Sequence, residues 1–204
     1  MNAPALRLTI ILALSALSIV GRLAVVWLPN VSLSYLALAV AGLAYGVRTG
    51  AAVGFLGRLG SDILISGLNP ILVPMTIVET MFGAAFGIIG TTFDATTFLS
   101  RATWWTRLIL FDLGIVVTLA YSVAADSATW VYYNLLLTDA PDAARGTLWT
   151  TLVVMGLVFS VIPAILNGVL FAAGLPPIFR GLEASALLQE RPLPKAPKSV
   201  DSTE

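Results

Sequence analysis

Long apolar runs separated by short polar stretches constrain this chain more than any other feature. Six such runs cover residues 5–28, 32–47, 51–66, 71–89, 108–130 and 148–173. A helix needs about 20 residues to cross the hydrocarbon core of a bilayer, and it satisfies its own backbone hydrogen bonds there. The runs therefore predict an all-α integral membrane protein: a bundle of six transmembrane helices, of which the second and third are short.

The composition agrees with a lipid environment and argues against several classes of function. Of the 204 residues, 58% are hydrophobic and 11% are charged, and the net charge is zero. Nothing offers the basic surface that nucleic acid requires, so we expect no nucleic-acid partner. The chain has neither cysteine nor histidine, which removes thiolate nucleophiles, the usual zinc sites and histidine acid–base chemistry. We therefore expect no enzyme activity, no metal site and no cofactor.

The positively charged residues predict the orientation in the membrane. Six crossings that begin in the cytoplasm leave only Arg145 in an outer loop, as the positive-inside rule favours. The inner set is then Arg7, Arg48, Arg101, Arg107, Arg180, Arg191, Lys195 and Lys198. We expect a multi-pass protein of the cell membrane with both termini in the cytoplasm. Residues 1–182 would form the transmembrane domain, and residues 183–204 a disordered tail.

Five charged residues fall within or near the spans instead of in loops. They are Arg22, Arg58, Asp62, Glu79 and Asp126. A charge at the centre of a membrane helix costs about 2.5–3.5 kcal/mol on insertion scales, so we expect these side chains to face the interior of the bundle. Arg58 and Asp62 are four residues apart and share a helix face, which an internal salt bridge would explain. The whole set instead favours a polar cavity open to the outside.

Two stretches resemble a known family of membrane proteins. "VGRLAVVWLPNVSLSYLALAVAGLAYGVRTGAAVGFLGRLGSDIL" (residues 20–64) is similar to the amino-terminal half of the substrate-binding S-components of energy-coupling-factor vitamin transporters. The shared features are Arg22 late in the first span, the "PN" turn, the set Gly46, Arg48 and Gly50, and a glycine-rich third helix. "ILNGVLFAAGLPPIFRGL" (residues 165–182) resembles the family's last helix and its exit.

The resemblance implies a subunit that captures a vitamin-like small molecule and docks on a transmembrane coupling protein driven by two cytoplasmic ATPases. No Gly-x-x-x-x-Gly-Lys-Ser/Thr loop is present, so ATP-driven work would come from those partners. The family's Ala-x-x-x-Ala docking spacing is absent from the first span. Its small residues are the expected docking contacts instead: Ala13, Ala16, Ser18, Gly21 and Ala24. The turns look most like those of cobalamin-type members, while folate and pantothenate stay open.

Depth and residue type predict the members of the substrate site. They are Arg22, Asn30, Ser32, Tyr35, Arg58, Asp62, Asn69, Glu79, Asp126, Tyr133 and Asn134. Arginine offers a planar fork for a carboxylate or phosphate, and the two tyrosines would either stack on a ring or anchor at the membrane interface. A stand-alone ion- or proton-coupled carrier, or a structural membrane subunit, is the alternative, because buried carboxylates also occur in proton relays.

Overall fold

The computed structural model describes residues 3–27, 31–93, 95–100, 103–136 and 142–185, and every regular element in these ranges is a helix. The helices are α1 (Ala3–Ala24), α2 (Ser34–Tyr45), α3 (Val47–Ser66), α4 (Leu72–Thr92), α5 (Ala95–Ser100), α6 (Trp104–Leu136) and α7 (Asp142–Ala184). The all-α prediction is confirmed for this part of the chain. Most of the predicted tail, residues 183–204, lies outside the described residues.

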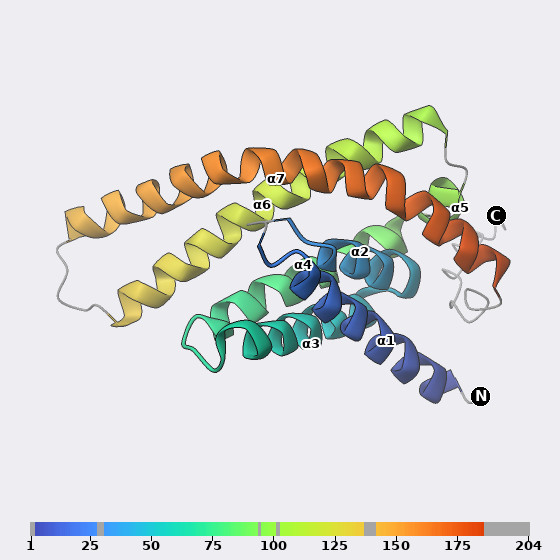
Figure 1. The fold of residues 1–204 in the computed structure, drawn as a ribbon, viewed down its shortest axis with the longest axis horizontal. Helices are drawn as coiled ribbons and strands as arrows, with labels where there is room; N and C mark the ends of the chain where they lie inside the picture. Colours follow the sequence, from blue (N-terminus) through green and yellow to red (C-terminus); the bar gives the residue numbers. More distant parts are fainter. Residues whose placement is uncertain (1–2, 28–30, 94, 101–102, 137–141, 186–204) are drawn as a thin grey trace, which may run out of the picture.

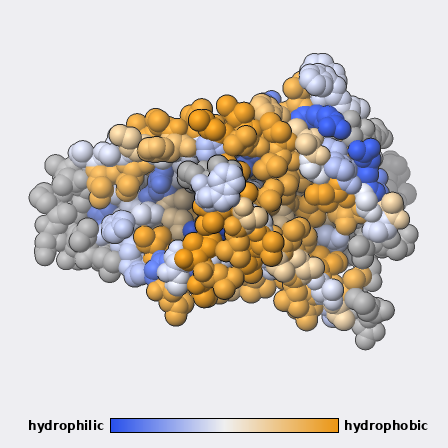
Figure 2. Space-filling model, viewed as in Figure 1, coloured by the Kyte–Doolittle hydropathy of each residue, from blue (hydrophilic) through white to orange (hydrophobic). Residues whose placement is uncertain are grey.

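Four helices, α1, α4, α6 and α7, are long and apolar enough to cross a membrane. Large apolar side chains are exposed along them, and hydrophobic residues cover most of the middle of the face shown in Figure 2. These features are those of a membrane protein. The expected second and third spans are less clear, because α2 has only 12 residues and α3 carries Arg48, Arg58 and Asp62.

The helices form two parts that we name the α1–α4 body and the α6–α7 hairpin (Figure 1). Helices α1 to α4 pack into a compact group, and the two long helices α6 and α7 lie against each other and across that group. The start of α1, the short helix α5 and the end of α7 lie at one end of the molecule. The facing ends of α6 and α7 lie at the opposite end.

A single glycine separates α2 from α3. Residues 48–50 were expected to separate the second and third runs, but Arg48, Thr49 and Gly50 are already helical and the break is Gly46. Its φ of 84° lies in the region that glycine adopts without steric strain. One residue is therefore enough to redirect the chain between two packed helices.

The last helix runs further than the sequence predicted. The sixth run was expected to end at residue 173, which is wrong, because α7 continues through Pro176 and Pro177 to Ala184. A proline inside a helix removes a hydrogen bond and disfavours the helix by about 3 kcal/mol. The residues beyond the prolines offset this penalty, since Phe179 is fully buried and Leu182 packs against the core.

Close backbone contact defines the packing of the α1–α4 body. Ten of the 12 residues of α2 are buried. A Cβ atom added to Gly50 would overlap the carbonyl of Gly83, and one added to Gly54 would overlap the carbonyl of Glu79. Small residues allow such approach between membrane helices. This contact of α3 with α4 brings the polar side chains of the two helices close together.

Candidate functional site

Four of the five charges that were expected within or near the spans meet inside the α1–α4 body. Arg22 of α1 lies 2.5 Å from a carboxylate oxygen of Glu79 in α4, and Arg58 of α3 lies 2.7 Å from Asp62 in the same helix. Two longer contacts, Arg58 to Glu79 at 3.6 Å and Arg22 to Asp62 at 4.0 Å, join the two pairs. We name these four residues the ionic cluster. Its formal net charge is zero.

Glu79 is the most deeply buried member of the ionic cluster, with no exposed surface. Its Oε1 accepts a hydrogen bond from the hydroxyl of Ser34 at 2.8 Å, and that hydroxyl accepts one from Ser18 at 2.9 Å. Its Oε2 accepts from Arg22 and, at 3.3 Å, from the hydroxyl of Tyr121. A buried carboxylate needs such donors as well as a counter-charge, and Glu79 has both.

Asp62 is held less tightly than Glu79. Its side chain is 14% exposed, and its one close partner is Nε of Arg58. Across from it, Nη1 of Arg22 is 4.0 Å away, which is too far for a hydrogen bond. The Nε atom of Arg22 is buried and has no hydrogen-bond partner among the described residues. The Asp62 side of the ionic cluster therefore retains unused donor capacity.

Two tyrosines border the ionic cluster. The ring centroids of Tyr35 in α2 and Tyr121 in α6 are 5.2 Å apart, and Phe82 meets Tyr121 edge-on at 5.4 Å. The hydroxyl of Tyr121 accepts a hydrogen bond from Arg58 at 2.8 Å. Tyr35 was expected at the site and Tyr121 was not. The available signal for Tyr121 was its place as a polar-tipped aromatic residue in the middle of an apolar span.

A buried amide ties the start of α2 to the α6–α7 hairpin. Asn167 of α7 is fully buried; its Oδ1 accepts from the backbone N–H of Ser32 at 3.2 Å, and its Nδ2 donates to Thr118 of α6 at 3.0 Å. The hydroxyl of Ser32 accepts from the backbone N–H of Ser34. Ser32, expected as a substrate ligand, is thus engaged within the protein. The sequence interpretation missed this role of Asn167 and Thr118.

Asp126 does not join the other four charges. Its carboxylate accepts a hydrogen bond from Ser122 at 3.4 Å and packs against Gly156 of α7, where an added Cβ would overlap it. In the part of the chain that the structure describes, it forms no ion pair with Arg22 or Arg58. The expectation of five converging charges is corrected to four, because Asp126 lies on the face of α6 that meets α7.

The remaining expected site residues make local contacts. The side chain of Asn69 accepts a hydrogen bond from the backbone N–H of Leu72, the first residue of α4. The side chain of Asn134 donates to the carbonyl of Trp130 within α6. Tyr133 is 38% exposed and packs against its neighbour in sequence, with ring centroids 5.8 Å apart. None of these contacts involves the ionic cluster. Asn30 lies outside the described residues.

The small residues of α1 divide between two faces of the helix. Ser18 and Gly21 are buried inside the protein, whereas Ala13, Ala16 and Ala24 are exposed. Because Ser18 and Gly21 are buried, a partner protein cannot contact them in this conformation. The three alanines remain on the outer face of α1.

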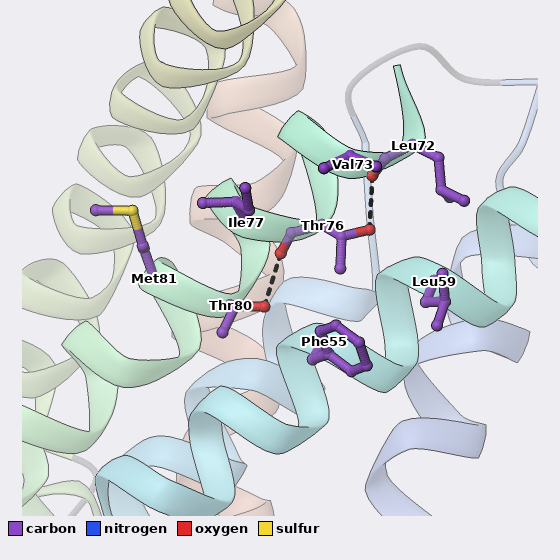
Figure 3. A pocket seen from close by; sticks show the side chains of 8 residues that line it. All are labelled: Phe55, Leu59, Leu72, Val73, Thr76, Ile77, Thr80 and Met81. Atoms are coloured by element: carbon purple, nitrogen blue, oxygen red, sulfur yellow. Dashed lines mark hydrogen bonds between the residues drawn. The ribbon is translucent and has the colours of Figure 1, made fainter. Parts of the chain in front are cut away.

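A separate apolar groove of about 390 Å³ lies between α3 and α4, as Figure 3 shows. No member of the ionic cluster lines it. Thr76 and Thr80 do, but their hydroxyls donate at 2.7 Å to backbone carbonyls of α4, so they turn no free donor towards the groove. The lining residues are Phe55, Leu59, Leu72, Val73, Thr76, Ile77, Thr80 and Met81. The groove therefore offers no free polar group to match the polar atoms of a solute.

A scan against protein-family models, a search of curated proteins and a search of solved structures each find no match. Within the described residues, no group of three or more acidic, cysteine or histidine side chains is placed to hold a metal ion. The functional conclusion therefore depends on the chemistry of the ionic cluster and its surroundings.

Proposed function

We propose that this chain crosses the cell membrane six times and captures a vitamin-like small solute from outside, as the substrate-binding subunit of an energy-coupling-factor importer. The observation that carries the proposal is the ionic cluster with its two tyrosines. It lies where α1, α2, α3, α4 and α6 meet, and each of these helices contributes a side chain. A solute bound there would contact most of the bundle at once.

The chemistry of the ionic cluster favours a binding role over a purely structural one. Apolar residues of similar volume often stabilise a fold as well as a buried ion pair does, so four buried charges exceed what fixing a helix register requires. Charged residues inside membrane proteins commonly mark substrate pathways. Arg22 and Arg58 provide forks for a polar group, and Tyr35 and Tyr121 provide ring faces for an organic one.

The arrangement of the helices supports six crossings. With α5, the start of α1 and the end of α7 at one end of the molecule, these ends of the described helices fall on the side to which the loop arginines assign the cytoplasm (Figure 1). Helix α2 is roughly 18 Å long, shorter than the hydrocarbon core of about 30 Å. Its near-complete burial by neighbouring helices supports a short crossing that lipid does not contact.

The proposed partners are a transmembrane coupling protein and two cytoplasmic ATPases. The outer face of α1 supports such docking, because Ala13, Ala16 and Ala24 are exposed there and small residues let another membrane helix approach closely. The chain contains no phosphate-binding loop of its own. Energy for release of the solute would come from the ATPases.

The test combines identification of the solute with one substitution. Mass spectrometry of the detergent-purified protein should detect a co-purified small molecule, and cobalamin, folate and pantothenate are the added candidates. In Arg58→Ala, binding should weaken by roughly a hundredfold or more, because a charged hydrogen-bonding partner is lost. Arg107→Ala, at an exposed position of α6, is the matched control. If no solute is found, or if Arg58→Ala binds it with unchanged affinity, the proposal is wrong.

A proton-coupled carrier is the second candidate, and the complete burial of Glu79 favours it. Buried carboxylates occur in the proton relays of membrane carriers, and Glu79 has no exposed surface. The purified chain reconstituted alone into liposomes separates the two functions. Solute uptake driven by a pH gradient, without any ATPase, would identify a carrier. Tight binding without uptake would identify a capture subunit.

A further inference from the structure

We infer that the captured solute carries a carboxylate, and that Asp62 occupies the place of this group while the solute is absent. The inference rests on the proposed capture function and assigns its substrate class. On binding, the carboxylate of the solute would displace Asp62 from Arg58 and reach the unused donors of Arg22. Three observations carry this assignment.

The first observation is the asymmetry between the two carboxylates of the ionic cluster. Glu79 is fully buried and accepts from hydroxyls on two other helices, so it is fixed by its surroundings. Asp62 accepts one close hydrogen bond, from an arginine in its own helix, and its side chain is 14% exposed. A rotation of one side chain would free Asp62, whereas release of Glu79 would require separating helices.

The second observation is the charge balance. The ionic cluster contains two arginines and two carboxylates, which cancel. A carboxylate added to the complete set would leave one buried negative charge uncompensated, which is strongly unfavourable away from water. If the solute takes the place of Asp62, the buried site stays neutral and Asp62 turns towards the molecular surface, to which 14% of its side chain is already exposed.

The third observation is the incomplete hydrogen bonding of Arg22. Its Nε is buried without a partner in the described part of the chain, and its Nη1 is 4.0 Å from Asp62. The short Asp62 side chain serves Arg58 and does not reach Arg22. A carboxylate that is not attached to α3 can lie between the two guanidinium groups and accept hydrogen bonds from both. Charge-assisted hydrogen bonds of this kind are strong. The ionic cluster therefore fits a free carboxylate better than it fits its own Asp62.

Chemical rescue by acetate tests whether an external carboxylate can occupy the Asp62 position. Asp62→Ala should lower the unfolding temperature of the full chain in detergent. Acetate should then raise it by about 2–4 °C relative to chloride at equal ionic strength, and acetamide, which has the same shape without the charge, should not. Asp112→Ala, at an exposed position of α6, is the matched control and should show no response to acetate. A response of Asp62→Ala that equals the control would overturn the inference.

A second variant uses the co-purified solute and does not depend on rescue. Asp62→Asn keeps the size of the side chain but removes the competing charge, so an acidic solute should bind roughly tenfold tighter or more. Unchanged or weaker binding would contradict the assignment. A bound solute that depends on Arg58 but contains no acidic group would overturn this inference and leave the capture function standing. Absence of any solute would overturn both.

Discussion

The α1–α4 body and the α6–α7 hairpin are both apolar helical structures, but they differ in how charged side chains are paired and in how many apolar side chains are exposed. In the body, α2 buries ten of its 12 residues, and four charged side chains neutralise one another inside. In the hairpin, α7 extends over 43 residues with side chains such as Phe159 and Ile162 exposed. Asp126 in α6 has a serine as its hydrogen-bond partner and no cation among the described residues.

The difference shows where specificity is located in this molecule. Membrane helices associate through close packing of small residues. In the hairpin, Gly114 of α6 lies against Gly168 of α7 in this way. The ionic cluster makes the body depend on correct placement of α1, α3 and α4, since each contributes a charge. The hairpin contacts the ionic cluster through Tyr121, and Asn167 joins it to the start of α2.

The strongest test of the comparison is the loss of Glu79. In Glu79→Ala, Arg22 and Arg58 lose a buried counter-charge, and breaking a buried pair in this way costs about 3–5 kcal/mol. We expect a large fall in unfolding temperature, measured by near-UV circular dichroism in detergent. The exposed Asp112→Ala should unfold like the native protein. Native-like stability of Glu79→Ala would show that the ionic cluster does not hold the body together.

Close backbone contact in the body gives the next largest effect. In Gly83→Leu, the new side chain collides with the backbone of α3 at Gly50, and overpacking of this kind costs about 1–3 kcal/mol or more. Thermal unfolding in detergent measures the loss. Gly181→Leu is the control, because nothing lies within 4 Å of a Cβ added there. Equal stability of the two variants would disprove tight α3–α4 contact.

The link between the two parts is expected to contribute less. Asn167→Leu leaves the N–H of Ser32 without its partner, while the hydroxyl of Thr118 still donates to the carbonyl of Gly114; one unsatisfied buried group costs about 1–2 kcal/mol. Hydrogen exchange should accelerate at the start of α2 and stay unchanged in the middle of α3. If exchange at α2 does not change, the bridge does not couple the hairpin to the body.

Asp126 should give the smallest effect. It has no ion-pair partner in the described ranges, so Asp126→Asn leaves no unpaired cation and should change stability by no more than about 0.5 kcal/mol. Solute binding should also keep its affinity, measured beside Arg58→Ala in the same assay. A loss of binding in Asp126→Asn would add the α7-facing side of α6 to the site, beyond the contact that Tyr121 already makes, and would remove the contrast between the two regions.

Local sequence patterns predicted some features of the site well. The i, i+4 spacing of Arg58 and Asp62 predicts their contact, because it depends on one helix alone. The insertion penalty of an intramembrane charge predicts that Arg22 and Glu79 face inward. The partnership of Glu79 with Ser34 and Tyr121 was not predictable in this way, since it depends on how three helices are rotated relative to one another.

The sequence by itself determined the all-helical, membrane character of this protein, because apolar runs of helical length act along the chain and need no knowledge of neighbours. It also showed which charges fall within or near the apolar runs. Only the tertiary structure decided which charges meet, since the position of a residue along a helix does not specify where its side chain points in the folded protein. Asp126 faces α7, while the other four charged side chains converge. Tertiary packing likewise holds the part of α7 beyond Pro176 and Pro177, where Phe179 is fully buried and Leu182 packs against the core.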